Sequence, residues 1–323
     1  MPRDIAPRLL RAFVTVAGEL HFTRAAARLF VAQQALSRDI GRLERELGVT
    51  LFLRTTRSVE LTADGQRLLP YARRVLAAQD ELVAACADGG GRPLLVDVGS
   101  PYATAHRVLA EARSAAPGTE FFARFHSGLT GAAEDVLVGR LDVSFGRVAG
   151  LAPAVLARLE HCPVRYEPMT VVLPADHPLA GLPAVPLAAL AGESVYTGAG
   201  NPATAEWTGL ADLLFAGRRI AALPPLPPIE GKDEFARVMQ KLGRPVLASV
   251  EFVDMPWAVR RPLVEPVPLS AVSMVWRRGL RHPGLDVLLE AARSLGEAER
   301  WLERPAGSWL PDVDGTLMAS IGK

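Results

Sequence analysis

The sequence predicts two parts, an all-α N-terminal winged helix-turn-helix with a long linker helix and a C-terminal α/β domain. Three observations lead to this prediction. Two short helical patterns and a β-ribbon pattern lie between Phe22 and Thr62, and one long helical pattern follows them. After the glycines at 89–91, short apolar runs alternate with helical patterns, which predicts a parallel, doubly wound sheet.

The helix-turn-helix is expected between two residues of types that commonly mark the ends of helices. Thr23 is a good N-cap for a first short helix, and Gly48 is a typical stop for the second, which starts at Gln33. A supporting helix precedes them, because apolar residues recur at helical spacing from Leu9 to Leu20. With about 100° per residue, one narrow face of the second helix collects Leu36, Ile40, Leu43 and Leu47.

The opposite face of the second helix carries polar groups of the kind that read DNA. Gln bonds adenine, Arg bonds guanine, and Ser bonds a base or a phosphate, while a glycine lets the backbone approach closely. Two short strands then flank Arg54, Thr55 and Arg57, a basic wing suited to phosphates or a narrow minor groove. An ordinary amphipathic helix with a solvated basic face would share any one of these features. The polar face comprises Gln34, Ser37, Arg38, Gly41, Arg42 and Arg45, with Gln33 on its flank.

A long helix is expected from Thr62, its N-cap, to about residue 87, followed by a hinge at 89–93. Pro70 lies inside it and should bend the helix or start it afresh. Its apolar side has no cover in its own domain, so we expect a partner helix in a dimer. Packing on the chain's own second domain is the alternative. The apolar side includes Leu68, Tyr71, Val75 and Leu82.

Composition allows a DNA-binding protein without announcing one. The 323 residues carry a net charge of +1, yet ten arginines face five acidic residues between Arg3 and Arg57. A locally basic module on a neutral protein favours specific DNA binding over bulk polyanion binding. No run of about 18 apolar residues occurs, and the N-terminus lacks an apolar signal segment, so we expect a cytoplasmic protein without a membrane span.

A family resemblance runs through the stretch FTRAAARLFVAQQALSRDIGRLERELGVTLFLRTTRSVELTADGQRLL, which looks like the N-terminal domain of LysR-type transcriptional regulators. The family often has Ser-Gln-Pro where this chain has Ala32-Gln33-Gln34, so the usual Ser N-cap is missing and the target sequence is expected to differ. The resemblance implies base contacts from Gln33, Gln34, Ser37 and Arg38, phosphate contacts from Arg24 and Arg42, and wing contacts from Arg54 and Arg57.

The resemblance also implies a periplasmic-binding-protein-like effector domain of two lobes. The expected organisation is a DNA-binding domain at 1–61, a linker and dimerisation helix at 62–88, a hinge at 89–93, an effector-binding domain at 94–300 and a tail at 301–323. Lobe I covers about 94–168 and 267–300, and lobe II covers about 169–266. By resemblance, dimers or tetramers bind an interrupted palindrome, and an effector changes DNA bending and contact with RNA polymerase.

An effector site is expected beyond the carboxyl ends of the lobe I strands, where ligands bind in open α/β sheets. Serine hydroxyls and free backbone N–H groups there favour an anion, and Arg147 or His126 would supply charge, so a small carboxylate is the favoured class. The same serines serve equally well as ordinary N-caps. The expected residues are Ser100, Pro101, His126, Ser127, Gly146 and Arg147 from lobe I, and Tyr196, Thr197, Gly198 and Asn201 from lobe II.

Other classes of protein fit the sequence less well. It contains no G-x-S-x-G elbow, P-loop or H-E-x-x-H motif, and its six histidines are scattered, so we expect neither an enzyme nor a metal or other cofactor. Cys162 is the single cysteine of the effector domain, which disfavours an intrachain redox switch. A transport solute-binding protein would need a signal peptide in place of 1–88. A DNA-binding regulator whose second domain serves assembly alone stays open, because the resemblance is weak from Gly181 to about Pro268.

Overall fold

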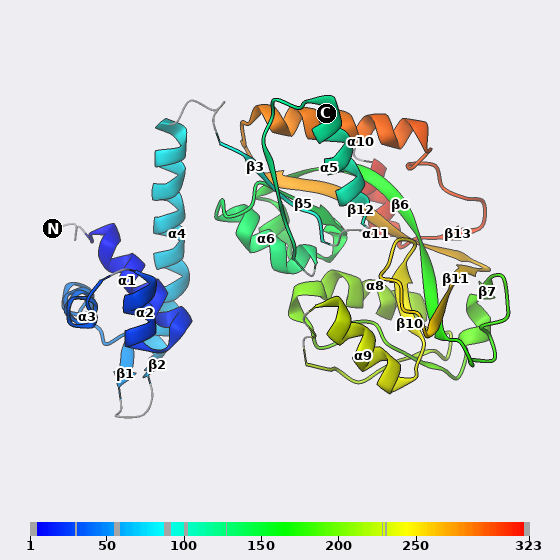
Figure 1. The fold of residues 1–323 in the computed structure, drawn as a ribbon, viewed down its shortest axis with the longest axis horizontal. Helices are drawn as coiled ribbons and strands as arrows, with labels where there is room; N and C mark the ends of the chain where they lie inside the picture. Colours follow the sequence, from blue (N-terminus) through cyan, green and yellow to red (C-terminus); the bar gives the residue numbers. More distant parts are fainter. Residues whose placement is uncertain are drawn as a thin grey trace. The chain divides into compact units, whose positions relative to one another are not determined.

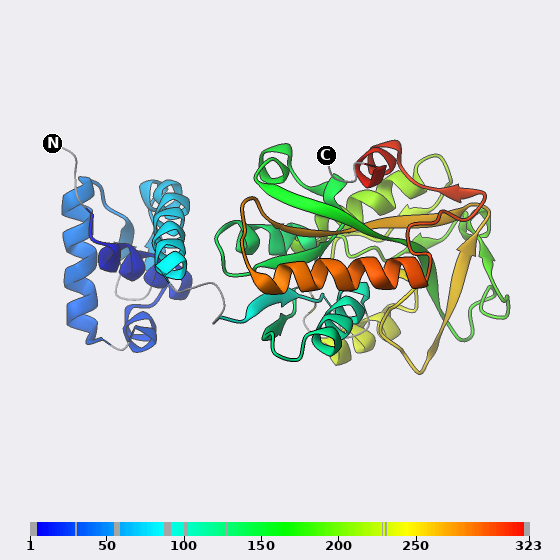
Figure 2. The ribbon, with the colours of Figure 1, turned by 90° about the horizontal axis from the view of Figure 1, so that it is seen from above.

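The computed structural model describes residues 5–29, 31–54, 59–86, 92–99, 103–126, 128–227, 229 and 231–319. The chain forms two compact units, Met1–Asp88 and Gly89–Lys323. The first is a helical unit with a small β-ribbon, and the second is built on a mixed sheet with helices against it (Figures 1 and 2). No helix in the described ranges has the length and apolar character needed to cross a membrane.

The N-terminal unit packs its first three helices and the ribbon around one apolar core. Phe13 and Phe22 both contact the ring of Phe52 edge to face, with ring centroids 5.6 and 6.1 Å apart, which fastens the ribbon to the helices. Core residues also come from α4. The elements are α1 (Pro7–Glu19), α2 (Phe22–Arg28), α3 (Gln33–Leu47), β1 (Phe52–Arg54), β2 (Val59–Leu61) and α4 (Ala63–Cys86).

The local signals at the helix ends have mixed outcomes. Gly48 ends α3 in the left-handed conformation (φ 73°), and the Thr62 hydroxyl accepts a hydrogen bond from the N–H of Gly65, so both predictions are confirmed. The prediction that Thr23 is an N-cap is wrong. The helix begins at Phe22, the side chain of His21 accepts from the N–H of Arg24, and Thr23 instead donates to Gln33. A bend or a restart was predicted at Pro70, and the restart does not occur, because α4 continues through Pro70 as one helix.

The C-terminal unit contains the expected α/β domain. Its large sheet has the order β4-β3-β5-β12-β6-β11-β7, with β10 on β6 and β13 on β12. The strands β3, β4 and β5 pair in parallel, as predicted. The prediction of a parallel sheet is wrong for the strands around β6, because β12 runs antiparallel to both β5 and β6, and β10 and β11 run antiparallel to β6. The elements at its start are β3 (Leu94–Asp97), α5 (Thr104–Ala115), β4 (Phe121–Arg124), α6 (Leu129–Leu137), β5 (Val143–Gly146), η1 (Val148–Gly150), α7 (Pro153–Leu156) and β6 (Leu159–Pro174).

The rest of the unit builds the second half of the sheet and returns to the first. Two long strands, β6 and β12, pass through both halves of the sheet. The remaining elements are β7 (Val185–Pro186), η2 (Leu187–Leu190), β8 (Ser194–Val195), η3 (Pro202–Thr204), α8 (Ala205–Phe215), β9 (Ala221–Ala222), α9 (Lys232–Leu242), β10 (Val246–Ser249), β11 (Ala258–Val264), β12 (Val267–Arg277), α10 (Pro283–Ala298), β13 (Ser308–Trp309) and α11 (Asp312–Ala319).

Helices cover both faces of this sheet. One apolar cluster joins β3, β4, β5 and β12 to α5 and α10, and another joins Leu95 of β3, Leu159 of β6 and Val275 of β12 to α6. Further along the sheet, α8 packs in one cluster and α9 in another. The sequence pattern located the elements from β3 to β5, the end of β12 and α10. It located neither the helices and strands from β7 to β11 nor the tail, where β13 and α11 are ordered secondary structure in a stretch that has no clear periodicity.

Replacing Ile40 by Ala should destabilise the N-terminal unit by about 2–5 kcal/mol, because Ile40 is fully buried and a cavity would remain. Leu53→Ala is the matched control, since Leu53 is 58% exposed. In thermal unfolding, the transition of the N-terminal unit should fall for the first variant, whereas that of the C-terminal unit should stay. A loss shared by both units would contradict their description as separate compact units.

Candidate functional site

The outer face of α3 is fixed by what the inner face buries. Leu36, Ile40 and Leu43 are at most 1% exposed, so the side chains on the opposite side of the helix must face solvent. The structure places Gln33, Gln34, Arg38, Arg42 and Arg45 there as exposed residues, with Ser37 half-buried beside them. The polar face predicted from the wheel is therefore brought together on one side of one helix.

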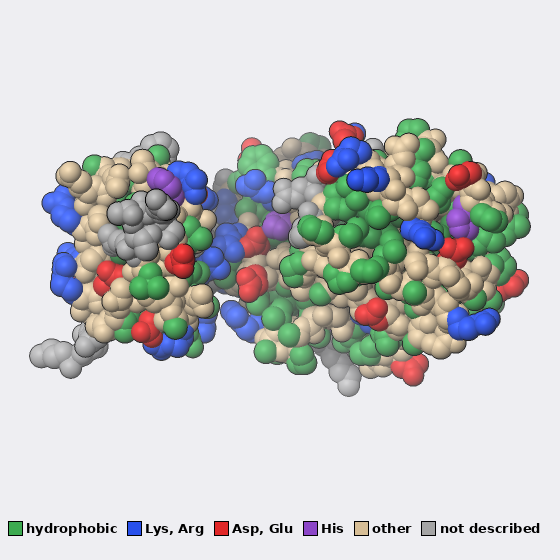
Figure 3. Space-filling view, turned by 90° about the horizontal axis from the view of Figure 1, so that it is seen from below, with side chains coloured by type: hydrophobic (Ala, Val, Ile, Leu, Met, Phe, Trp, Pro, Cys, Tyr) green, Lys and Arg blue, Asp and Glu red, His purple; other side chains and the backbone are tan. Residues whose placement is uncertain are grey.

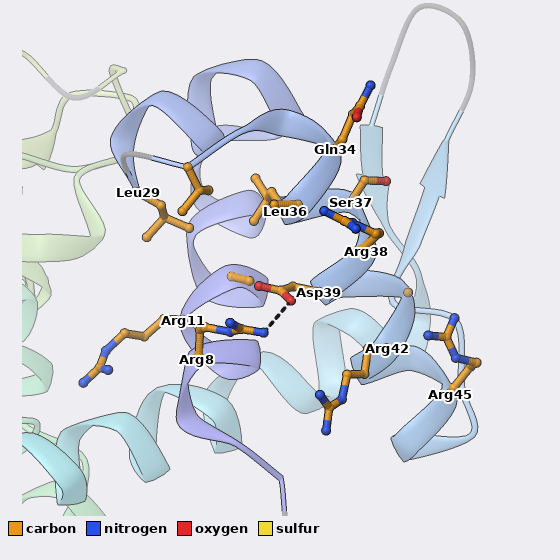
Figure 4. Close-up of a pocket in the computed structure, with 14 residues that line it drawn as sticks. Arg8, Arg11, Leu29, Gln34, Leu36, Ser37, Arg38, Asp39, Arg42 and Arg45 are labelled. Carbon is orange, nitrogen blue, oxygen red and sulfur yellow. Dashed lines mark hydrogen bonds and ion pairs between the residues drawn. The ribbon is translucent and has the colours of Figure 1, made fainter.

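A groove of about 920 Å³ runs along this face, between α1 and α3. In Figure 4 the side chains of Gln34, Ser37, Arg38, Arg42 and Arg45 follow one another along α3, and Arg8 points toward Asp39 from α1. Arg11 of α1 also lines the groove, but its side chain points away from α3 and donates to Gln79 of α4 (3.1 Å). The two α1 arginines were not among the predicted site residues. Their spacing by three on one helix was the available signal.

The arginines of this face fall into two groups, those that pair with a carboxylate and those that do not. Arg42 pairs with Glu46 (2.7 Å) and Arg8 with Asp39 (3.0 Å), and the Glu46 hydrogen bond raises the pKa of Arg42 further above its already high ordinary value. Within the described residues, Arg38 and Arg45 have no hydrogen-bond or ion-pair partner. Their guanidinium groups therefore keep all their donors available for an anion or a base edge.

The remaining predicted residues of this surface differ in what holds them. The Arg24 side chain donates to the carbonyl of Glu19 (2.7 Å), so it is held against the preceding turn of the chain. Gln33 accepts from Thr23 (3.1 Å), which joins the start of α3 to α2. Ala32 precedes α3 without a side-chain cap, as the sequence indicates. The first N–H groups of α3 thus lack a side-chain partner, and such groups favour anions.

The wing is positioned by a residue that the sequence did not single out. Glu44 on α3 accepts from the N–H groups of Leu51 (2.8 Å) and Phe52 (3.3 Å), at the start of the ribbon. The strands then pair with Phe52 opposite Leu61. Thr55, Arg57 and the side chain of Arg54 lie outside the described residues. Across the face drawn in Figure 3, basic side chains lie around the rim of the N-terminal unit, and acidic and basic ones mix on the C-terminal unit.

At the predicted effector site the structure describes part of the residues. Ser100, Pro101 and Ser127 lie outside the described ranges. His126 is half-buried, and its N–H donates to the carboxylate of Asp97 (3.0 Å). Burial raises the pKa of Asp97 despite this and two further hydrogen bonds. Gly146 ends β5 against Leu129, where a Cβ atom would approach the Leu129 side chain to 2.5 Å.

Arg147 is buried rather than presented to an open cleft. Its side chain is 6% exposed and forms a two-point ion pair with Asp314 of α11, at 2.8 and 2.7 Å. Its third nitrogen donates to the backbone carbonyl of Glu206 (3.3 Å). The charge that the sequence assigns to an effector is therefore neutralised by the chain's own tail in this structure.

A second internal carboxylate caps α6. Glu206 of α8 accepts from the N–H groups of Leu129 (2.7 Å) and Thr130 (3.1 Å) and from the Thr130 hydroxyl. A carboxylate is the group that a helix N-terminus favours. Sequence reasoning missed both Glu206 and Asp314, because the first is an isolated acid in an apolar helix and the second lies in the tail.

The four lobe II residues have unlike environments. Tyr196 packs its ring edge-on against Phe235, with centroids 5.8 Å apart, and Asn201 caps η3 by accepting from Ala203 (3.0 Å). Gly198 adopts φ 77°, in the left-handed region that favours glycine. Thr197 is 1% exposed, and its hydroxyl has no hydrogen-bond partner among the residues that the structure describes. Of the four, Thr197 alone presents a buried polar group that needs a partner.

Cys162 and His161 do not form a reactive pair. Burial raises the pKa of the Cys162 thiol to about 11, which disfavours the thiolate at neutral pH, and burial lowers the pKa of His161. A thiol whose pKa is raised in this way is a poor nucleophile at neutral pH.

Comparisons with known proteins cover both units. Residues 7–66 match the family model described as bacterial regulatory helix-turn-helix protein, lysR family, and residues 93–222 match the LysR substrate binding domain. The uncharacterized HTH-type transcriptional regulator YnfL of Escherichia coli (strain K12) is 32% identical, over 84% of this chain and 92% of that protein. The small neutral protease regulatory protein of Streptomyces lividans is 37% identical, over 95% of this chain and 90% of that protein.

Solved structures share the fold. The crystal structure of CbnR, a LysR family transcriptional regulator, matches with a TM-score of 0.65 at 21% identity, over 90% of this chain and 99% of that one. Full-length CbnR complexed with its target DNA matches with a TM-score of 0.63 at 22% identity, over 90% of this chain and 99% of that one.

Replacing Gly41 by Ala should separate stability from DNA recognition. Gly41 lies inside α3, where an added Cβ would meet only the Arg45 side chain at 3.6 Å, so the N-terminal unit should gain about 0.5–1 kcal/mol. The added methyl lies on the groove face, so it should weaken binding to a specific DNA site. Gly18→Ala is the control, because Gly18 lies on α1 away from the groove. Equal DNA affinity for both variants would argue against close approach at Gly41.

Proposed function

The chain belongs to the LysR family of DNA-binding transcriptional regulators, and from this premise we propose that the outer face of α3 reads the major groove of its operator. The protein is a regulator rather than an enzyme. Because it works on bacterial DNA, we place it in the cytoplasm as part of the same proposal.

The observation that carries this proposal is the exposed guanidinium of Arg38, which has no partner within the described residues and lies beside Ser37 on the same face as Gln34. An Arg with all its donors available can bond guanine at two points, and Gln can bond adenine in the same way. Arg45 lies two turns further along the same face and suits a phosphate. Arg42 and Arg24 are held by Glu46 and Glu19, so we assign them to the backbone of the DNA, together with the wing residues Arg54, Thr55 and Arg57.

We propose that two copies bind an interrupted palindrome, either as a dimer or within a tetramer. Tyr71 and Val75 on α4 are 58% and 50% exposed, which supports α4 as the surface that a second copy covers. A two-fold dimer would place two α3 helices on two half-sites of the DNA. Regulation through RNA polymerase belongs to this proposal as well.

For the C-terminal unit we propose response to a small-molecule effector at the carboxyl ends of β3, β4 and β5. The buried hydroxyl of Thr197, which has no partner in the described part of the chain, supports a polar ligand near the second half of the sheet. The other residues that we assign to this proposed site are Ser100, Pro101, His126, Ser127, Gly146, Arg147, Tyr196, Gly198 and Asn201. A domain that serves assembly alone is the second candidate, favoured by the internal carboxylates on Arg147 and at the start of α6.

Replacing Arg38 by Ala should weaken specific DNA binding by roughly 10- to 100-fold, because a two-point contact to a base is worth about 1–3 kcal/mol. Binding to unrelated DNA should change much less. Affinity for the operator and for scrambled DNA would be measured at several salt concentrations, with Arg67→Ala as the control, since Arg67 pairs with Asp64 on α4. An equal loss on both DNAs would contradict a base-reading role for Arg38.

A further inference from the structure

We propose that the C-terminal helix α11 is an intramolecular ligand of the C-terminal unit, in which Asp314 fills the carboxylate position at Arg147. An acidic effector that reaches Arg147 would then have to displace Asp314. This competition rests on the proposed response to a small carboxylate, whereas the role of α11 as an internal ligand stands on the contacts alone.

The pair has the geometry by which proteins bind a carboxylate ligand. Two nitrogens of Arg147 donate to the two oxygens of Asp314, at 2.8 and 2.7 Å, and the two side chains are 6% and 1% exposed. Fork-to-fork pairing of this kind is how Arg recognises carboxylates in general. Arg147 also follows β5 directly, at the carboxyl end of the strand, which is where ligands of α/β proteins bind.

Arg147 connects the tail to both halves of the domain. Its remaining donor reaches the backbone carbonyl of Glu206, whose carboxylate in turn holds the start of α6 through Leu129 and Thr130. The adjacent turn η1 also packs closely against α8, because a Cβ atom on Gly150 would lie 2.3 Å from the Cβ atom of Glu206. A change at Asp314 should therefore be felt at α8 and α6, neither of which contains a residue bonded to Asp314.

The rest of α11 docks through its apolar side chains. Met318 is buried, with its sulfur 3.7 Å from the Ser273 hydroxyl, and Leu317 packs on the cluster under α6. Asp312 and Val313 are exposed. An isolated helix of eight residues is unstable in water, so α11 depends on its docking for its structure.

The burial of Arg147 explains why release of Asp314 is coupled to its replacement by another anion. A buried guanidinium that loses its carboxylate keeps an uncompensated charge, which is strongly unfavourable. The Asp314 carboxylate can therefore leave at low cost only when another anion takes its place. An effector carboxylate would supply that anion and would set α11 free, which links ligand binding to a local folding change.

The test compares Asp314→Ala with Asp312→Ala, which removes an exposed carboxylate from the same turn of the same helix. In the full-length protein, the first variant should lower the melting temperature of the C-terminal unit by roughly 10 °C and the second by no more than about 3 °C. Sodium formate at about 100 mM should restore part of the loss in Asp314→Ala, relative to equal sodium chloride, because formate replaces the deleted carboxylate.

Two further measurements keep the proposal open to refutation. Asp314→Asn keeps the volume of the side chain, so it should lose stability without rescue by formate, and it replaces the Ala variant if that variant does not fold. Hydrogen exchange at the amides of Leu129 and Thr130 should speed up in both variants of Asp314. Equal melting temperatures for the Asp312 and Asp314 variants, or faster exchange confined to α11, would overturn the internal-ligand role.

The competition has its own readout. Wild-type protein should gain no stability from formate beyond that from chloride, since Asp314 already fills the site. An equal gain in wild type and Asp314→Ala would contradict the claim that an anion at Arg147 competes with the Asp314 carboxylate. None of these readouts uses DNA. Failure of the Arg38 experiment would therefore count against the proposed reading of the operator and would leave the α11 result standing, and the reverse also holds.

Discussion

The burial of three aliphatic residues on α3 is the constraint on which the DNA-binding surface depends. Leu36, Ile40 and Leu43 occupy the centre of the N-terminal core, and they recur at the spacing of one helical face. Once they are buried, Gln34, Ser37 and Arg38 lie on the opposite side of α3, which faces solvent. The rotation of α3 about its own axis is thereby fixed by the hydrophobic effect, before any DNA is present.

Carboxylates then determine which cations of this surface are available. Glu46, Asp39 and Glu19 each hold an arginine, whereas Arg38 and Arg45 have no such partner in the described part of the chain. In the C-terminal unit, carboxylates also bind positively charged groups, but there they are buried. Glu206 and Asp314 bind a helix N-terminus and a buried arginine there, at positions where a ligand anion would otherwise be expected.

The sequence allowed prediction of those features that depend on neighbours along the chain. The polar face of α3, the stop at Gly48 and the cap at Thr62 follow from periodicity and from local hydrogen bonding. The Arg147–Asp314 pair joins residues 167 positions apart, and Glu206 reaches Thr130 across 76. Such contacts depend on the tertiary fold, and neither acid carries a local signal. Thr23 shows the same limit on a smaller scale, because its bond to Gln33 decides its role.

The most direct test of groove reading by α3 is methylation protection of guanine N7, which lies in the major groove. It would be measured on the promoter region beside the protein's own gene, with wild-type protein and with Arg38→Ala. The wild type should protect guanines in two half-sites spaced by whole helical turns, about 10 base pairs each. The variant should lose protection at one guanine in each half-site. Protection that is identical with both proteins would contradict the assignment of Arg38 to a base.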